Sequence, residues 1–400
     1  MIFNTILFYI VFLLPAAVLI RRLPLAVREW MIAAIGAAFF VTFSLTGSGG
    51  IAGALCLGLL ILISMIILCL VRQGQRLGLV LAIAASVGTL AFFKYGNFFL
   101  VSVIGLSKSH GLYWKDAFLP LGISFFTFEF VHYAVDVFQG KTPPVRASKF
   151  FAFILYFPTM VAGPIKRIQD FDLGVAQPGT LEARTDVHRG ITRVLVGLAK
   201  KFVIADLLSA VTDHLVRADI DSVDSRWLPV AWIFAYGIKI YMDFSAYSDI
   251  AIGSSRILGI KVAENFDNPY GKTNISLFWR HWHISLYRWL IDYVLVPCGG
   301  LRGGVIVTFR NVWIVMLVSG LWHGAGWQFI AWGAWHAFGL SVHRIWNQVG
   351  LGARVANALP TWMVISMSWL ITFVYVNLGW TFFAMDFHTA MVWWGKVMHG

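Results

Sequence analysis

The chain has 400 residues, of which 59% are hydrophobic and 12% carry a charge. Because a soluble domain carries about 25% charged residues, this composition excludes an ordinary soluble protein and predicts an all-α polytopic membrane protein. The formal net charge of +12 is interpreted as a signal of membrane topology, because lysine and arginine collect in the cytoplasmic loops of membrane proteins. Nucleic-acid binding is not expected, because the sequence shows no soluble domain that would carry a basic binding surface. We expect a single integral-membrane domain over residues 1–400.

The first apolar runs are long enough to cross a bilayer and are separated by short loops. The expected spans are 2–20, 30–45, 51–71, 77–93 and 117–138. Arginines follow the first and third runs, whereas the second is followed by the uncharged segment 46–50. This alternation follows the positive-inside rule and predicts an external N-terminus. The mixed, aromatic segment 94–116 is expected to form an interfacial helix.

The segment 141–201 holds ten Lys or Arg residues against four Asp or Glu residues, which predicts a cytoplasmic location. Its apolar part, 150–162, is too short to span a membrane and contains Pro158, so we expect a re-entrant segment. Two interpretations stay open for it: the wall of a cavity or donor entrance, and a buried connector that binds no ligand.

Further apolar segments bring the expected total to about ten or eleven spans. They are 191–216, 228–260, 305–321, 328–342 and 362–383.

The span 117–138 carries Glu129, His132 and Asp136 at spacings of three and four, which places them on one helix face. They are interpreted either as a proton relay or polar pore wall, or as a buried network that fixes the register of the helix. A metal site is disfavoured because this face offers only one histidine.

A second polar stretch lies at 241–249, where Asp243 and Tyr247 are one helical turn apart. These two residues either line the same cavity as the histidines described below, or Asp243 pairs structurally with Lys239 or Arg256.

The segment 274–293 is rich in histidine and tryptophan. His281 and His283 differ by two positions, so on a helix only one of them is expected to enter a cavity. Trp279 is a further candidate for the cavity wall. Arg280 is suited either to a phosphate group of a donor or to a lipid headgroup at the membrane surface.

His323 follows an apolar span and precedes Gly324, which predicts a close approach of another backbone. An imidazole can take a proton from a hydroxyl at neutral pH, although a lone histidine on an apolar face is more often structural. His283 and the neighbouring Trp322 favour the functional interpretation. The sequence lacks the motifs of a serine hydrolase, a P-loop NTPase or a zinc protease, and its three cysteines lack metal-site spacing.

Several motifs in their order along the chain resemble the membrane-bound O-acyltransferase (MBOAT) family, and in particular its bacterial alginate O-acetylation branch. The residues that carry this resemblance are the segments 92–95, 119–128, 157–165, 243–249, 264–270, 278–286 and 321–324, together with Tyr133 and Asp136. The chain departs from the family pattern at Ile291, where an arginine is usual, and at Leu301, where an asparagine is common.

The resemblance implies a helical bundle around a central tunnel, with re-entrant or interfacial helices, in the bacterial inner membrane. It implies His323 as the catalytic histidine and His283 as the second catalytic residue. Asp136, Asp243, Tyr247, Trp279, Arg280 and Trp322 are then candidates for lining the tunnel.

The resemblance further implies transfer of an acetyl or other short acyl group from a cytoplasmic thioester such as acetyl-CoA, with no bound cofactor and no metal. The acceptor would be an extracytoplasmic polysaccharide, reached directly or through a periplasmic SGNH-type partner. Two alternatives remain: D-alanyl or lipid acyl transfer within the same family, and an ion or solute transporter, for which the chain shows no inverted repeat.

Overall fold

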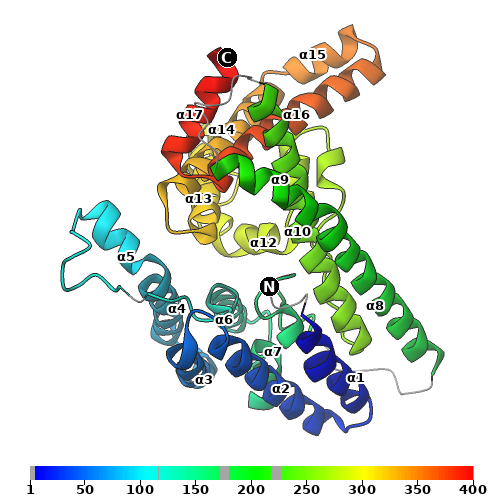
Figure 1. The fold of residues 1–400 in the computed structure, drawn as a ribbon. Helices are drawn as coiled ribbons and strands as arrows, with labels where there is room; N and C mark the ends of the chain where they lie inside the picture. Colours follow the sequence, from blue (N-terminus) through cyan, green and yellow to red (C-terminus); the bar gives the residue numbers. More distant parts are fainter. Residues whose placement is uncertain (1–4, 116, 172–179, 218–226, 400) are drawn as a thin grey trace. The chain divides into compact units, whose positions relative to one another are not determined.

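A computed structural model describes residues 5–115, 117–171, 180–217 and 227–399. The described chain consists of helices and connecting loops and contains no β-strand (Figure 1). This confirms the helical class expected from the continuous apolar runs.

The contacts divide the chain into two compact units. Unit 1 comprises Met1–Leu198 and Tyr247–Ala263, and unit 2 comprises Ala199–Ala246 and Glu264–Gly400. Helix α10 (Trp227–Ile257) contributes to both units. The single domain expected from the sequence stays a prediction, and each unit is described by itself.

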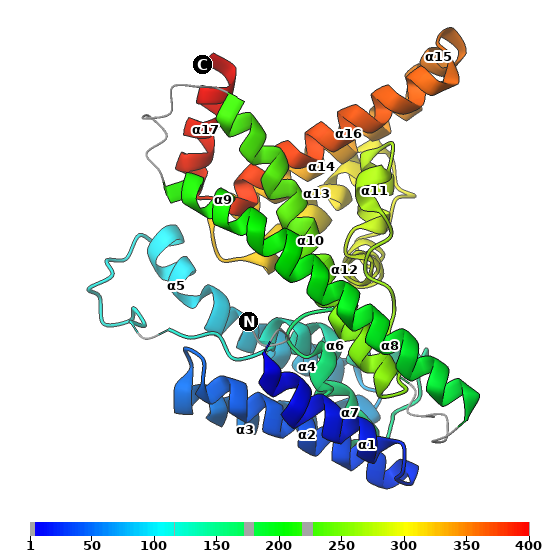
Figure 2. The ribbon, with the colours of Figure 1, turned by 45° about the vertical axis from the view of Figure 1, so that its right-hand side comes forward.

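Unit 1 is built mainly from long apolar helices. In chain order it contains η2 (Phe8–Leu13), α1 (Leu14–Ile20), α2 (Leu25–Leu45), α3 (Gly50–Arg72), α4 (Arg76–Leu90), α6 (Ile123–Phe138), α7 (Ala147–Ile154), η5 (Phe157–Thr159) and α8 (Leu181–Ala199). Helices α1, α2 and α3 lie side by side (Figure 2). Phe39, Phe40 and Phe157 are fully or almost fully buried in the core of this unit.

Local sequence explains where the first helices begin and end. Pro24 precedes α2 and has the extended backbone that a helix start requires (ψ 151°). Gly74 joins α3 to α4 with a φ of +64°, which favours glycine because it has no Cβ. The boundaries predicted for the second, third and fourth spans therefore agree with α2, α3 and α4 to within a few residues, apart from the earlier start of α2 and the extension of α4.

Two expectations about unit 1 were wrong. The segment after residue 93 does not form a separate interfacial helix; the helix begun by α4 continues through η3 (Ala91–Tyr95), α5 (Gly96–Phe98) and η4 (Phe99–Val103). Helix α6 begins at Ile123 and not at residue 117, because Pro120 and the left-handed Gly122 (φ +69°) precede it.

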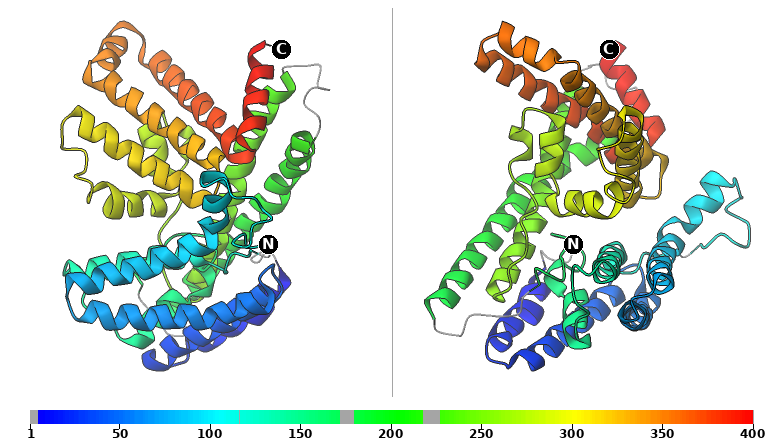
Figure 3. Two further views of the ribbon diagram at one scale, coloured as in Figure 1. Left: turned by 90° about the vertical axis from the view of Figure 1, so that its left-hand side faces the viewer. Right: turned by 180° about the vertical axis from the view of Figure 1, so that it is seen from behind.

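Unit 2 contains the segments that carry the candidate histidines. Its elements are η6 (Lys200–Ala205), α9 (Asp206–Arg217), η8 (Pro269–Gly271), α11 (Ile275–His281), α12 (Ile284–Leu290), η9 (Ile291–Leu295), α13 (Val305–His323), α14 (Trp327–Gln348), α15 (Leu351–Ala358), α16 (Thr361–Ala384) and α17 (Phe387–His399). Helices α13 and α14 form an antiparallel pair, and α14 also packs against α16 (Figure 3).

Five helical stretches of the described chain are long and apolar enough to cross a membrane. They are Val27–Leu45, Gly50–Arg72, Arg76–Val103, Val305–His323 and Thr361–Ala384. Large apolar side chains on their surfaces, such as Ile51 and Leu55, are more than 70% exposed, as expected for groups that face lipid. The chain is thus a multi-pass membrane protein, and the higher count of ten or eleven spans stays a prediction.

Candidate functional site

His283 occupies the short connection between α11 and α12. Asn274 begins α11 by accepting a hydrogen bond from the main-chain N–H of Leu277 (2.9 Å), and α11 ends at His281. His283 then adopts a left-handed backbone (φ 44°, ψ 56°) and starts α12. This conformation is uncommon for a residue with a Cβ and concentrates at functional sites. The His283 side chain turns inward and is 1% exposed.

The ring of His283 is held at its Nδ1 atom. This atom lies 3.0 Å from Oδ1 of Asn265 and 3.5 Å from Oγ of Ser285. Phe244 packs edge-on against the ring, with ring centroids 4.7 Å apart. The other nitrogen, Nε2, is buried and makes no hydrogen bond within the described part of the chain.

Burial lowers the pKa of His283 from its ordinary value of 6.5 to about 3, because a charged imidazole loses its hydration inside the protein. The ring is therefore neutral at physiological pH. A neutral imidazole with one unoccupied nitrogen can accept a proton.

His283 lines a cavity within unit 2 that has a volume of about 120 Å³. Trp279 and Arg280, two of the candidates for lining a tunnel, also line it. The remaining wall is mostly aliphatic and comes from α12, η9, the loop that follows η9, α13 and α14. It includes Leu286, Leu290, Ile291, Leu295, Leu301, Val312, Val315, Met316 and Leu340. Within the part of the chain that the structure describes, the residues that line the cavity include no aspartate or glutamate. The cavity is thus a small apolar chamber with a few polar groups.

His323 is the last residue of α13 and is half-buried among aromatic rings. The centroid of its ring lies 5.1 Å from that of Trp332 and 4.9 Å from that of Phe383. Trp322 contacts both histidines, with its ring centroid 5.8 Å from that of His283 and 4.8 Å from that of His323. Both histidines thus contact the same tryptophan, although Trp322 and His323 are not among the residues that line the cavity.

The prediction that Gly324 admits another backbone was wrong in its detail. A Cβ on Gly324 would lie 1.9 Å from the ring of Phe329, so the glycine admits a side chain. The close backbone approach is one turn earlier, where a Cβ on Gly320 would lie 2.1 Å from the carbonyl oxygen of Phe329.

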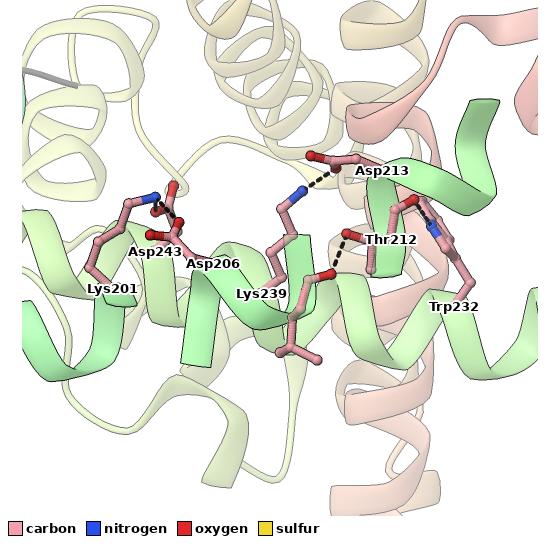
Figure 4. A network of polar contacts seen from close by, with 8 residues as sticks. Lys201, Asp206, Thr212, Asp213, Trp232, Lys239 and Asp243 are labelled. Carbon is pink, nitrogen blue, oxygen red and sulfur yellow. Dashed lines mark hydrogen bonds and ion pairs between the residues drawn. The ribbon is translucent and has the colours of Figure 1, made fainter. Parts of the chain in front are cut away.

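Asp243 takes part in an ion-pair network within unit 2 (Figure 4). Lys201 Nζ lies 2.8 Å from Asp243 and 2.7 Å from Asp206. Lys239 pairs with Asp213 instead, at 2.6 Å, and the expected pairing of Asp243 with Lys239 or Arg256 was wrong. These contacts link η6 and α9 to α10.

Asp136 and Tyr247 belong to unit 1. Asp136 accepts a hydrogen bond from Gln169 (2.6 Å), and Tyr247 is a buried member of the core of that unit. On the same face of α6, Glu129 pairs with Lys166, and His132 Nε2 accepts the main-chain N–H of Ile168 (3.1 Å). This extensive bonding favours the interpretation as a network that fixes helix register.

Sequence reasoning missed Asn265 and Ser285, which contact the His283 ring. Asn265 lies 18 residues before His283, and no local pattern joins the two. It also missed His336, which is fully buried and packs edge-on against Trp279 and Trp332. No group of three or more His, Cys, Asp or Glu side chains in the described residues could hold a metal ion.

Comparison with known proteins identifies the family of the chain. The profile of the membrane-bound O-acyltransferase family matches residues 67–375. A probable alginate O-acetylase of Pseudomonas aeruginosa is 38% identical over 79% of this chain and 58% of its own length. The peptidoglycan O-acetyltransferase of Helicobacter pylori is 35% identical over 82% of this chain and 64% of its own length.

A more distant relative is the teichoic acid D-alanyltransferase of Streptococcus thermophilus, which is 30% identical over 56% of this chain and 57% of its own length. The chain spans about three fifths of the length of the alginate O-acetylases that it matches. The extent of the family match and the identity to these relatives show that the chain belongs to the membrane-bound O-acyltransferase family.

Proposed function

We propose that this protein transfers an acetyl or another short acyl group from a cytoplasmic thioester, such as acetyl-CoA, toward an extracytoplasmic polysaccharide. The acceptor is reached directly or through a periplasmic SGNH-type partner, and the protein resides in the bacterial inner membrane. Family membership and relatives named as O-acetylases of alginate and peptidoglycan support this proposal. The observation that carries it is the buried, neutral His283, whose Nε2 has no protein partner among the described residues beside a small apolar cavity.

The proposed chemistry needs a proton acceptor near a thioester. The acceptor hydroxyl attacks the thioester carbonyl, a C–O bond forms, and the hydroxyl proton moves to an imidazole nitrogen. The C–S bond then breaks, and the imidazolium returns the proton to the departing thiolate. We assign this acid–base work to His283 and His323, which both contact Trp322.

The cavity wall favours an acetyl group over a D-alanyl group. A D-alanyl group carries an ammonium, which is costly to bury without a partner of opposite charge. The lining residues offer Arg280 and no carboxylate, so the ammonium would meet a like charge. The volume of about 120 Å³ suits a short acyl chain, because an engineered cavity of about 150 Å³ binds a molecule the size of benzene.

The test is a transfer assay in proteoliposomes with radiolabelled donors and a polysaccharide acceptor, with and without a periplasmic SGNH-type protein. We expect label transfer from acetyl-CoA, and at least tenfold less from palmitoyl-CoA or a D-alanyl thioester. His323→Ala should lose transfer while inserting normally. Full transfer by that variant would refute the role of His323, and uptake of a labelled solute without any donor would support a transporter instead.

A further inference from the structure

We infer that Asn265 is a positioning residue that holds His283 in the tautomer with its hydrogen on Nδ1, so that Nε2 is the atom that accepts the proton. This inference rests on the proposed function, because it names the reacting atom within the same site. It is carried by the hydrogen bonds around the Asn265 amide.

The orientation of the Asn265 amide follows from its neighbours. The main-chain N–H of Ser285 donates to Oδ1 of Asn265 at 3.2 Å, and the Ser285 hydroxyl donates to the same atom at 2.8 Å. A main-chain N–H can only donate, so the atom that faces it must be the amide oxygen and not the NH₂ group.

The amide oxygen in turn fixes the tautomer of His283. Oδ1 of Asn265 carries no hydrogen, so the Nδ1 atom of His283, 3.0 Å away, must be the donor. A neutral imidazole has one hydrogen on its two nitrogens, and Nε2 is therefore left with a lone pair. The hydroxyl oxygen of Ser285 lies 3.5 Å from Nδ1, but its hydrogen is donated to Oδ1 of Asn265. It therefore does not donate a hydrogen bond to Nδ1 of His283.

Nε2 of His283 is buried, and His283 is one of the residues that line the cavity. Asn265 and Ser285, which contact the Nδ1 edge, are not among the lining residues. Nε2 has no hydrogen-bond partner in the described chain, and a substrate hydroxyl in the cavity would supply one.

Main-chain contacts hold the ring and its partner together. The N–H of Ile284 donates to the carbonyl of Asn265 at 2.9 Å, and the N–H of Asp267 donates to the carbonyl of His281 at 3.0 Å. These two bonds join the segment 265–267 to the α11–α12 connection and support the left-handed backbone of His283. Asn265 therefore acts through both its main chain and its side chain.

The test replaces the acceptor oxygen of Asn265. Asn265→Ala should lower kcat about a hundredfold or more, since general base catalysis contributes about 10²–10⁴-fold, with KM changed less than threefold. Asn265→Asp retains an acceptor at Oδ1 and should keep kcat within tenfold, while its added negative charge moves the acid limb of the pH–rate profile upward. Asn347→Ala is the matched control, because it removes an exposed asparagine on α14 whose amide lies 3.2 Å from the ring of His343, and neither residue lines the cavity; we expect less than a threefold loss.

A second readout does not depend on acyl transfer. Nitrogen-15 NMR of histidine-labelled protein, with the His283 signals assigned by His283→Gln, should show a protonated Nδ1 and an unprotonated Nε2 in the native protein. Asn265→Ala should add the opposite tautomer. A native His283 protonated at Nε2, or a native kcat in Asn265→Ala, overturns the inference. If the native protein shows the expected tautomer but transfers no acyl group from any donor, the proposed function is overturned. The tautomer assignment would still hold in that case.

Discussion

His283 combines features that a purely structural histidine would not need. Its backbone is left-handed, its ring is 1% exposed, and its Nε2 lacks a partner within the described residues. Leaving a buried polar atom unsatisfied costs about 1–3 kcal/mol. Sequences generally avoid such costs except at functional sites, and this supports a catalytic role for the ring.

From the low pKa of His283 we predict that the folded protein loses stability as the pH falls. Burial lowers this pKa to about 3, so between about pH 6.5 and 3 the unfolded chain binds a proton at residue 283 and the folded chain does not. Stability therefore falls as the pH falls through this window, by about 2 kcal/mol between pH 7 and pH 5. His283→Gln removes this contribution, and its thermal midpoint in detergent should fall less on acidification than that of the native protein.

The matched control for this measurement is His188→Gln, which changes an exposed histidine on α8. That variant should keep the native dependence of the thermal midpoint on pH. Equal acid sensitivity of the native protein and His283→Gln would contradict the assignment of a buried, neutral ring.

Some residues of the candidate site could be predicted from the sequence, and others could not. The histidine-rich segment and the family resemblance made Trp279, Arg280 and His283 candidates for lining a cavity or tunnel, and all three line the cavity described above. Sequence reasoning did not find Asn265, which contacts His283 through a fold-dependent approach that no local spacing records. It also gave Asp243 the wrong partner, because Lys201 reaches Asp243 from a different helix.

At the scale of elements, the α13–α14 pair positions the aromatic surroundings of His323. A Cβ on Gly320 would lie 2.1 Å from the carbonyl oxygen of Phe329, and a Cβ on Gly333 would lie 2.5 Å from the carbonyl oxygen of Met316. The two backbones are thus in contact, as is common where small residues line a membrane helix pair. His323 ends one of these helices, and Trp332, which packs on its ring, lies in the other.

This contact predicts that Gly320→Ala separates the two helices. The added methyl group has no space, and overpacking of this kind costs about 1–3 kcal/mol. We expect a lower thermal midpoint and reduced acyl transfer, because the ring of His323 would shift relative to Trp332. Gly88→Ala in α4 is the control, since a Cβ there has nothing within 4 Å. Equal behaviour of the two variants would argue against the close approach.

Helix boundaries were predicted best where glycine residues separate one apolar run from the next. The glycines near residue 50 and at residue 74 mark the end of α2 and both ends of α3, whereas the start of α2 directly after Pro24 was predicted too late, at residue 30. The segment after residue 93 was misjudged because its mixed, aromatic composition suggested a separate interfacial helix, whereas the preceding helix continues past Lys94 and Asn97 to Val103. Asn97 is satisfied by hydrogen bonds with the main chain of Trp114, which removes the need for a break.

At the scale of the whole molecule, the proposed reaction needs a defined orientation in the membrane. Arginines at the end of α3 and the start of α4 favour a cytoplasmic side for that turn, and the uncharged turn between α2 and α3 favours the outside. This orientation would give the donor and the acceptor access from opposite sides.

Cysteine labelling in intact cells tests the orientation. In a variant with Cys56, Cys69 and Cys298 replaced by alanine, a membrane-impermeant maleimide should label Ser48→Cys directly. It should label Gln73→Cys only after the membrane is permeabilised. Both positions are exposed, so access to the reagent is not limited by the fold. The reverse labelling pattern would contradict the assigned topology.

The central claim is that Nε2 of His283 accepts the proton of the acceptor hydroxyl. Its most direct test is the single-turnover rate of labelled acetyl transfer from acetyl-CoA by His283→Gln protein, compared with native protein at equal membrane levels. The account predicts a loss of at least about a hundredfold, in the range of general base catalysis. Transfer by His283→Gln at the native rate would contradict it.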